Sequence, residues 1–301
     1  RDYYASRGLG DVYKRQQKDF SMLKYVVFAV TEKERQVLDR SRAELEQVFT
    51  GEKTEFLIVS AAQTEEGILR LRMEESLILT DDPAYLKALQ AAGFYTAGLH
   101  HKENQGTFFE GAAYVIEEIG EITFSVYDEI YRRLAGLPLM ITRTKRLLIR
   151  ESTVEDVPEF YRIYRDPSIT KYMEDLFEDP EEEIAYMKEY IRQIYGFYGY
   201  GMWTVQLLSG EVIGRAGLSV REGYELPELG FVIGCDYQGQ GYAEEACRAV
   251  LAYGKKEISF EHVQALVEEE NLPSRNLLIK LGFHFDKKVN EKGTEYLLMI
   301  D

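Results

Sequence analysis

Cysteine and histidine are scarce in this chain of 301 residues, which has two cysteines and four histidines. Cys235 and Cys247 are too few for a disulfide framework, and no cysteine or carboxylate stands at ligand spacing from His100 and His101. We therefore predict no metal and interpret the histidine pair as part of a loop. Cys235 is interpreted as a small residue that fills space.

Long apolar runs are also missing. None approaches the roughly 20 residues that a membrane-spanning helix needs, and no signal peptide is apparent, so we expect a cytoplasmic protein without membrane contact. Basic residues are outnumbered, 36 against 52 acidic ones, and the net charge is -16. This charge repels nucleic acid. It fits either a cationic substrate in an acidic cleft or a surface that only keeps the protein soluble.

The length and the 45% of hydrophobic residues suffice for two domains with separate cores. Residues 1–16 fit neither domain, because residues 6–16 read as the in-frame translation of a transposon-based sequencing adaptor. We expect this segment to be an artefact and native sequence to resume near Gln17. The oligomeric state is left open.

Residues 17–138 alternate short apolar runs with helix-like stretches, the pattern of a small α/β layer structure. Pro83 and Gly93 bound one of the expected helices. We predict a Rossmann-like α/β domain, followed by a linker over residues 139–145. The expected strands are 25–30, 56–59, 77–79, 95–98 and 114–116, and the expected helices are 32–49, 83–92 and 125–134.

One stretch of this domain, Thr-Asp-Asp-Pro at 80–83 followed by small residues at 88–93, resembles the last motif of haloacid-dehalogenase-type phosphohydrolases. In that family a strand-end Asp holds magnesium with a second acidic residue nearby. Here Tyr85 stands where the second acid is expected, and no Asp-x-Asp nucleophile lies upstream. We therefore interpret Asp81 and Asp82 as a strand-end polar residue and a helix cap, and the domain as degenerate and non-catalytic.

The most informative segment of the chain is a glycine-rich turn. Between a strand expected over 228–233 and a helix expected over 242–258, the sequence reads Gln238, Gly239, Gln240, Gly241, Tyr242, Ala243. Such a turn leaves backbone N–H groups unpaired at a helix N-terminus, where the helix dipole adds partial positive charge. Glycines let a ligand approach the backbone closely. The turn therefore predicts a pyrophosphate site.

With the motifs that follow, the C-terminal half resembles the GNAT acetyltransferase superfamily. Its acetyl-coenzyme A motif, Gln/Arg-x-x-Gly-x-Gly/Ala, is matched at 238–243, and the next motif is matched by Asn271 and by Gly282-Phe283. The resemblance covers roughly residues 144 to 301. It implies a domain over 146–301 with a mixed, mostly antiparallel sheet and flanking helices, and acetyl-coenzyme A as the co-substrate.

The resemblance also implies the site. A backbone N–H on the strand before the turn polarises the thioester, and for the base we favour Glu228 over Glu225, unless Glu228 is only an exposed strand-end carboxylate. The residues expected to contact the coenzyme are Phe231, Val232, Ile233, Gln238, Gly239, Gln240, Gly241, Tyr242, Ala243, Asn271 and Ser274.

The residues expected near the thiol of the coenzyme depart from the common family pattern. The tyrosine that many members carry seven residues after the motif Asn is replaced by Leu278. Ser274 stands three residues after Asn271, which resembles the branch that acetylates N-terminal amines of ribosomal proteins, where a Ser hydroxyl lies near the thiol. We expect Ser274 and Asn271 to be catalytic. Helix capping by either residue is the alternative.

From these motifs we expect an N-acetyltransferase that moves an acetyl group from acetyl-coenzyme A to a primary amine, in a small molecule or at a protein N-terminus, by direct attack in a ternary complex. One alternative is a non-catalytic acetyl-coenzyme A-binding sensor or scaffold. Another is a haloacid-dehalogenase-type phosphohydrolase, which the missing nucleophile disfavours. The acceptor is not named by any motif.

Overall fold

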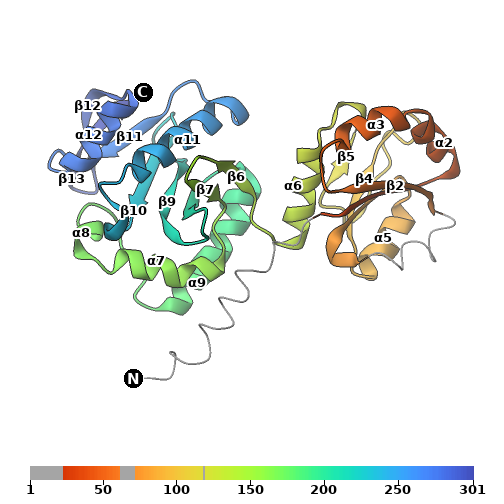
Figure 1. Ribbon diagram of the computed structural model, residues 1–301, viewed down its shortest axis with the longest axis horizontal. Helices are drawn as coiled ribbons and strands as arrows, with labels where there is room; N and C mark the ends of the chain where they lie inside the picture. Colours follow the sequence, from red (N-terminus) through yellow and green to blue (C-terminus); the bar gives the residue numbers. More distant parts are fainter. Residues whose placement is uncertain (1–22, 62–71, 118) are drawn as a thin grey trace. The chain divides into compact units, whose positions relative to one another are not determined.

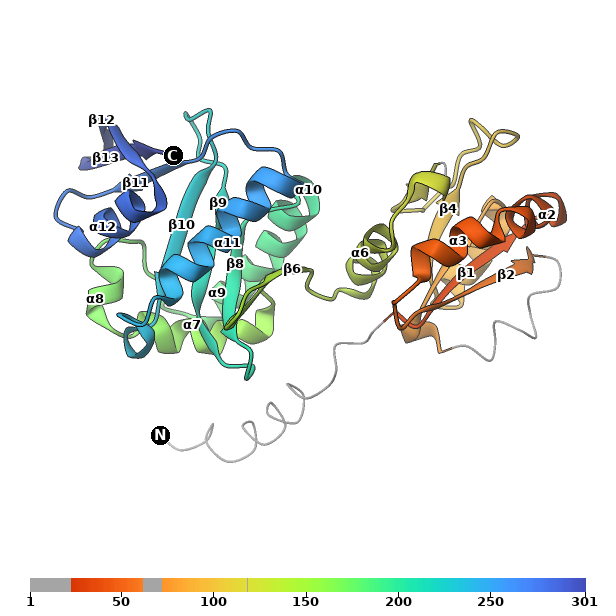
Figure 2. The same ribbon diagram turned by 45° about the horizontal axis from the view of Figure 1, so that its top comes forward.

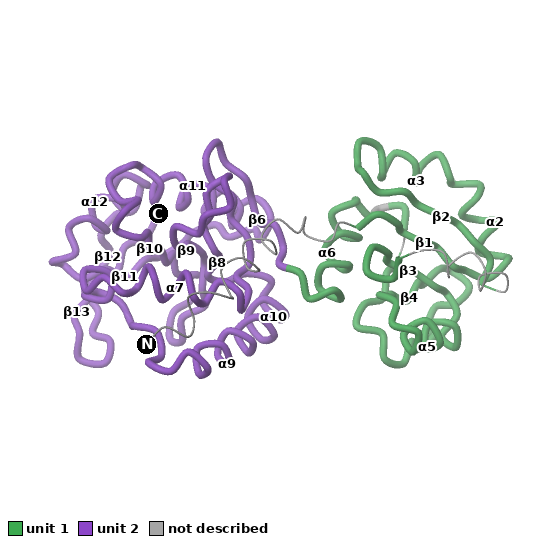
Figure 3. Tube along the Cα trace, turned by 60° about the horizontal axis from the view of Figure 1, so that its bottom comes forward, with its two compact units in different colours: residues 1–137 green, residues 138–301 purple. Residues whose placement is uncertain are grey.

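The computed structural model describes residues 23–61, 72–117 and 119–301. The suspected adaptor segment lies outside these residues. The chain divides into two compact units, Arg1–Leu137 and Pro138–Asp301 (Figure 3). Among the described residues, no helix is both long enough and apolar enough to cross a membrane.

The N-terminal unit, which runs from red to yellow in Figure 1, contains a parallel sheet with the strand order β2-β1-β3-β4-β5. Every strand lies within one residue of the bounds expected from the sequence. Short apolar runs bounded by turn residues therefore predicted these strands reliably. The strands are β1 (Tyr25–Val30), β2 (Glu55–Ser60), β3 (Ser76–Thr80), β4 (Tyr95–Leu99) and β5 (Val115–Ile116).

Helices cover both faces of this sheet, as a parallel sheet requires. Side chains of α2 (Glu32–Arg40), α3 (Arg42–Phe49) and α6 (Phe124–Ala135) form one buried cluster with the sheet. On the other face, α5 (Pro83–Ala91) contributes to a second buried cluster. The described part of the unit also contains two short 3-10 turns, Met73–Glu75 and Ile119–Glu121.

The single helix expected over 32–49 is wrong, because the structure has two helices that meet at Ser41. The Ser41 N–H still donates to Val37 O at 3.2 Å, while its own carbonyl accepts from Leu45 N at 3.2 Å. Ser41 thus ends α2 and begins α3. Both helices bury apolar residues against the sheet, Leu38 from α2 and Leu45 from α3.

The C-terminal unit is built on an eight-stranded sheet in the order β12-β13-β11-β10-β9-β8-β7-β6. Neighbours are antiparallel except β10 and β11, so the expected mixed, mostly antiparallel sheet is confirmed. The strands are β6 (Met140–Arg143), β7 (Leu147–Arg150), β8 (Met202–Leu207), β9 (Val212–Ser219), β10 (Glu228–Ile233), β11 (Gln264–Val267), β12 (His284–Glu291) and β13 (Thr294–Ile300).

The segment 139–145, expected to be a linker, instead contains β6. This strand pairs with β7, and Ile141 is buried in the core of the C-terminal unit. Gly136 ends α6 in a left-handed conformation with φ of 65°. The break in the sequence pattern is therefore real, but the strand begins almost directly after it.

Helices cover both faces of this sheet as well. Figure 2 shows α11 (Tyr242–Glu257) running across β9 and β10, with α7 (Val157–Tyr164) and α9 (Pro180–Tyr190) on the other side. The remaining helical segments are η4 (Val154–Asp156), α8 (Pro167–Thr170), the π-helical turn Ile191–Tyr195, α10 (Gly196–Tyr198), the 3-10 turn Cys235–Tyr237 and α12 (Leu272–Leu281).

A buried ion pair fixes where the first helical segment of this unit begins. Arg150 donates to both carboxylate oxygens of Asp156 at 2.7 Å, and both side chains are buried. Asp156 also accepts from the Thr153 N–H, within a capping box. The helical segment that begins after Thr153 is thus anchored to β7.

Candidate functional site

The candidate site lies where β10 and β11 separate. Within the described chain these parallel strands pair only at Glu228 and Gln264, while β10 stays paired with β9 along its length. Past Glu228, therefore, β10 has one edge that faces β11 without pairing to it.

Hydrogen bonds at both ends of β10 show which residues face this open edge. The Gln264 N–H donates to Pro227 O at 2.9 Å, and the Gly234 N–H donates to Ile213 O, beside β9. Because successive residues of a strand direct their N–H and C=O groups to opposite edges, Phe231 and Ile233 face the open edge. Val232, also expected at the site, directs its backbone toward β9.

The glycine-rich turn follows directly and is tied back to β10. The Gln238 side-chain amide donates to Ile233 O at 2.9 Å, so the first residue of the motif holds the end of the strand. Gln240 donates to Asp236 O at 3.0 Å. Gly239 and Gly241 have φ of 72° and 81°, a left-handed conformation that residues with a Cβ rarely adopt. The motif glycines are thus required by the backbone itself.

Helix α11 begins with free donors at this turn. Gly241 is its N-cap and offers no side-chain cap, and the first helical hydrogen bond runs from Glu245 N to Gly241 O at 3.1 Å. The N–H groups of Tyr242, Ala243 and Glu244 precede that bond. They form a helix N-terminus with the unpaired donors that the sequence predicts, and such donors suit an anion. Pyrophosphate binding there stays a prediction.

Two carboxylates in the first turn of α11 would oppose an anion if they were unpaired. Glu244 is paired with Arg248 at 3.0 Å and with Lys280. Glu245 accepts from Thr144 and Arg146, each at 2.6 Å. Burial acts to raise the pKa of Glu245, but these hydrogen bonds outweigh burial and lower it. Each negative charge is therefore matched by a neighbouring cation.

Arg146 is a residue of this site that the sequence analysis missed. Its guanidinium lies 4.2 Å from the centre of the Tyr242 ring and donates to Gln240 O at 3.0 Å. A Cβ at Gly241 would lie 3.6 Å from Arg146 Nη2. In the sequence, Arg146 is only the first residue after the expected linker 139–145. Its contacts lie 94 to 99 residues away, so no local pattern could reveal them.

Glu228, the favoured base, begins β10 and is paired with Arg221. Arg221 Nη2 lies 3.1 Å from Glu228 Oε1, and Arg221 Nε donates to the other carboxylate oxygen. The hydrogen bond with Glu228 raises the pKa of Arg221. The Glu228 side chain is 13% exposed, so the alternative of an exposed strand-end carboxylate is wrong. Glu225, the second choice, is exposed.

The residues expected near the thiol belong to α12. Asn271 is the N-cap, and its Oδ1 accepts from Ser274 N at 3.3 Å, so Asn271 has the capping role that the sequence analysis held as an alternative. The Ser274 hydroxyl has no hydrogen-bond partner among the described residues. Leu278, at the position of the common family tyrosine, is 1% exposed and packs in the core.

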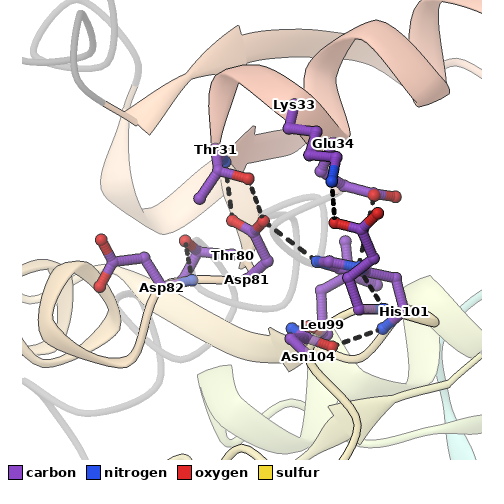
Figure 4. A network of polar contacts seen from close by, with 10 residues as sticks. Thr31, Lys33, Glu34, Thr80, Asp81, Asp82, Leu99, His101 and Asn104 are labelled. Carbon is purple, nitrogen blue, oxygen red and sulfur yellow. Dashed lines mark hydrogen bonds and ion pairs between the residues drawn. The ribbon is translucent and has the colours of Figure 1, made fainter.

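Both aspartates of the N-terminal unit accept hydrogen bonds from protein donors, and Figure 4 shows those of Asp81. Asp82 caps α5 by accepting from Ala84 N at 2.8 Å and Tyr85 N at 3.2 Å, which confirms its expected role. Asp81 accepts from Thr31 N at 2.8 Å and Thr31 Oγ1 at 2.6 Å. Most of the roughly four lone-pair positions of the Asp81 carboxylate are thus occupied once His101, at 3.3 Å, is included.

Comparisons with known proteins concern the C-terminal unit. Residues 146–284 match the profile of a family described as an acetyltransferase (GNAT) domain. The chain is 33% identical over 157 residues to YnaD of Bacillus subtilis, named an uncharacterized N-acetyltransferase, with 51% of this chain and 89% of that protein covered. It is 29% identical to the uncharacterized N-acetyltransferase p20 of Bacillus licheniformis, covering 46% and 80%.

Solved structures with a similar fold include a GNAT-family acetyltransferase of Bacillus anthracis. It is 23% identical, the match covers 53% of this chain and 96% of that one, and the TM-score is 0.45. Another is RimJ of Mycobacterium smegmatis in complex with coenzyme A disulfide, at 18% identity, 52% and 81% coverage and a TM-score of 0.45.

Proposed function

The chain belongs to the GNAT acetyltransferase family, and we propose that it transfers the acetyl group of acetyl-coenzyme A to a primary amine, in a small molecule or at a protein N-terminus. Membership makes it an acyltransferase. The observation that carries the proposal is the open edge of β10 beside an uncapped helix N-terminus. A strand edge and a phosphate site in succession suit a long ligand with a polar arm and a pyrophosphate.

In this proposal the coenzyme pyrophosphate binds at the turn 238–243 and the first N–H groups of α11. The helix dipole and the unpaired N–H groups attract the negative charge. Arg146 adds a fixed cation, because Glu245 and the Tyr242 ring hold its guanidinium beside the turn. The arm that carries the thioester then follows the open edge of β10 toward Phe231.

The reaction is direct attack within a ternary complex. The amine lone pair forms a C–N bond with the thioester carbonyl carbon, the C–S bond breaks, and the amine loses a proton. We propose that the Phe231 N–H donates to the carbonyl oxygen as that oxygen becomes negative, the electrostatic stabilisation that acyl transfer requires. The Ser274 hydroxyl then donates to the departing thiolate, while Asn271 holds the start of α12 by capping it.

Glu228 is proposed to accept the amine proton. Arg221 takes one hydrogen-bonding position on each carboxylate oxygen, and a carboxylate offers roughly four such positions in all. Positions therefore remain for an incoming ammonium or amine N–H group. A negative charge there also favours a cationic acceptor over an anionic one.

We further propose that the N-terminal unit is a Rossmann-like module without catalysis of its own. The parallel sheet with helices on both faces supports this assignment. Thr31 follows β1, and no Asp-x-Asp pair precedes Asp81 in the sequence. The Thr31 hydroxyl is used in the bond to Asp81.

Substitution of Gly241 by Asp should abolish coenzyme A binding, because it brings a carboxylate to the phosphate site. A ligand that binds only the folded state stabilises it by about 2.7 kcal/mol at about 100 times its Kd. Wild-type protein should therefore melt at a higher temperature with coenzyme A, and the variant should not. Gly51→Asp is the matched control, because φ at Gly51 is 87° and Gly51 lies in the N-terminal unit. A Gly241→Asp protein that keeps the shift would contradict the proposal.

Substitution of Ser274 by Ala should lower kcat by roughly ten to a thousand fold, the range for loss of one hydrogen-bonding or proton-donating group. The Kd for coenzyme A should change little. Release of free thiol with an acceptor found in a panel of primary amines gives kcat, and calorimetry gives Kd. Ser125→Ala, in the first turn of α6, is the control. Weakened coenzyme binding with intact kcat would assign Ser274 to structure alone.

Substitution of Glu228 by Gln should slow turnover at neutral pH, and the defect should shrink as the pH rises. At high pH more of the amine is already deprotonated in solution, so a protein base is needed less. The measurement is kcat/KM for the amine across the pH range. Glu225→Gln, an exposed neighbour, should behave as wild type. A lower melting temperature with unchanged kcat/KM would make Glu228 only a partner of Arg221.

A further inference from the structure

The N-terminal unit contains a cavity of about 960 Å³, within the range of roughly 300 to 1,000 Å³ that is usual for small-molecule sites. Helices α2 and α3, the loop after β4 and the segment after β5 form its wall. The two helices contribute the apolar side chains of Val37, Leu45 and Val48, and polar groups lie opposite them. The cavity thus offers an apolar surface and a charged one to the same occupant.

The surrounding polar residues lie at a position where α/β sheets commonly bind ligands. Thr31 follows β1, Asp81 follows β3, and His101 follows β4, so all three lie at the carboxyl edge of the parallel sheet. The chain passes from β1 to β2 on one side and returns to β3 on the other. Ligands of open α/β sheets bind at such reversals of strand order.

Most charges around the cavity are already neutralised within the protein. Lys33 pairs with Glu103 at 2.5 Å. His100 faces two acceptors, Thr107 O at 2.9 Å and Glu117 at 3.2 Å. The Thr107 carbonyl raises the pKa of His100 most, and Glu117 adds to the effect, so these contacts favour the protonated form of His100 beside Glu117.

Glu34 is the exception, and Figure 4 shows its position beside His101. Its side chain is 10% exposed and lines the cavity, yet no described residue donates a hydrogen bond to it. His101 Nδ1 lies 3.5 Å from the Glu34 carboxylate and accepts from Glu103 N at 3.4 Å, while His101 Nε2 lies 3.3 Å from Asp81. One imidazole supplies at most one positive charge for two buried carboxylates. Burial raises the pKa of Glu34, as expected for a carboxylate without sufficient compensation.

The remaining charges of the cavity wall indicate the sign of the charge that a ligand should carry. Beyond the neutralised pairs, the wall presents the carboxylates of Glu34 and Glu44 against the single ammonium of Lys102. An anion entering the cavity would meet a buried carboxylate. A cation would supply the charge and the donor that Glu34 lacks.

We propose that this cavity binds a small organic cation, an ammonium group attached to an apolar body. The cationic group lies against Glu34, and the apolar body packs on Val37, Leu45 and Val48. The site is separate from the acetyl-transfer site and does not rest on the proposed function of the C-terminal unit. The N-terminal unit would then be a ligand-binding module for cationic amphiphiles.

The test uses the full chain and benzyltrimethylammonium as the probe. This quaternary ammonium has no N–H group, so it cannot be acetylated. Calorimetry should show binding to the wild type that weakens about tenfold or more in Glu34→Gln, because a partly buried charge pair loses one member. Glu110→Gln, on an exposed residue of the same unit, should bind as wild type. Benzyl alcohol and phenylacetate, the neutral and anionic probes, should bind at least about tenfold more weakly than the cation.

A second variant covers the case in which Glu34→Gln disturbs the fold. Val37 lines the cavity but is 46% exposed, so Val37→Lys should be tolerated and should block a cation by like charge. Val126→Lys, also on an exposed helical position, is its control. The proposal is overturned if the wild type does not bind benzyltrimethylammonium at millimolar concentration. It is also overturned if both cavity variants bind like their controls, or if phenylacetate binds better than the cation.

Discussion

The divergence of β10 from β11 is the constraint on which the rest of the C-terminal unit depends. The two strands share one paired position, Glu228 with Gln264, and then separate. A sheet that stayed paired here would use every backbone group of β10 in its ladders. Because it does not, Phe231 and Ile233 keep groups directed to an open edge. The Gln238 side chain and the left-handed glycines then turn the chain sharply into α11.

Local charge compensation is what the proposed coenzyme site needs in an acidic protein. The chain carries a net charge of -16, and its surface as a whole repels phosphate. At the α11 N-terminus, however, Glu244 and Glu245 are each paired with basic residues. Charges in contact outweigh those beyond a Debye length of about 8 Å at physiological salt. The helix N-terminus and Arg146 therefore set the potential that a phosphate meets.

What the sequence predicted correctly depends on short-range patterns. The strands of the N-terminal unit are short apolar runs between turn residues, as is usual for a parallel sheet covered on both faces. The turn at 238–243 also lies within one strand-turn-helix segment, so its glycines could be read directly. Ser41 shows the limit of this approach, because the periodicity of residues 32–49 continues through a helix break. Likewise β6 was hidden because it follows Pro138 without an intervening loop signal.

The missed parts of the sites are contacts between distant segments. Arg146 reaches the glycine-rich turn at 238–243 only because β7 and α11 pack together. In the N-terminal unit, Glu34, Asp81 and His101 meet because parallel strands end at one edge of the sheet. The residues themselves carry no spacing that predicts this. In both cases the topology had to be known before the side chains could be assigned to one place.

The most direct test of this account is a crystal structure of the full chain with coenzyme A. The account predicts pyrophosphate oxygens within hydrogen-bond distance of the N–H groups at the start of α11. It also predicts that the arm carrying the thiol lies along the open edge of β10, with the sulfur near Ser274. A coenzyme bound anywhere else, for example in the cavity of the N-terminal unit, would contradict it.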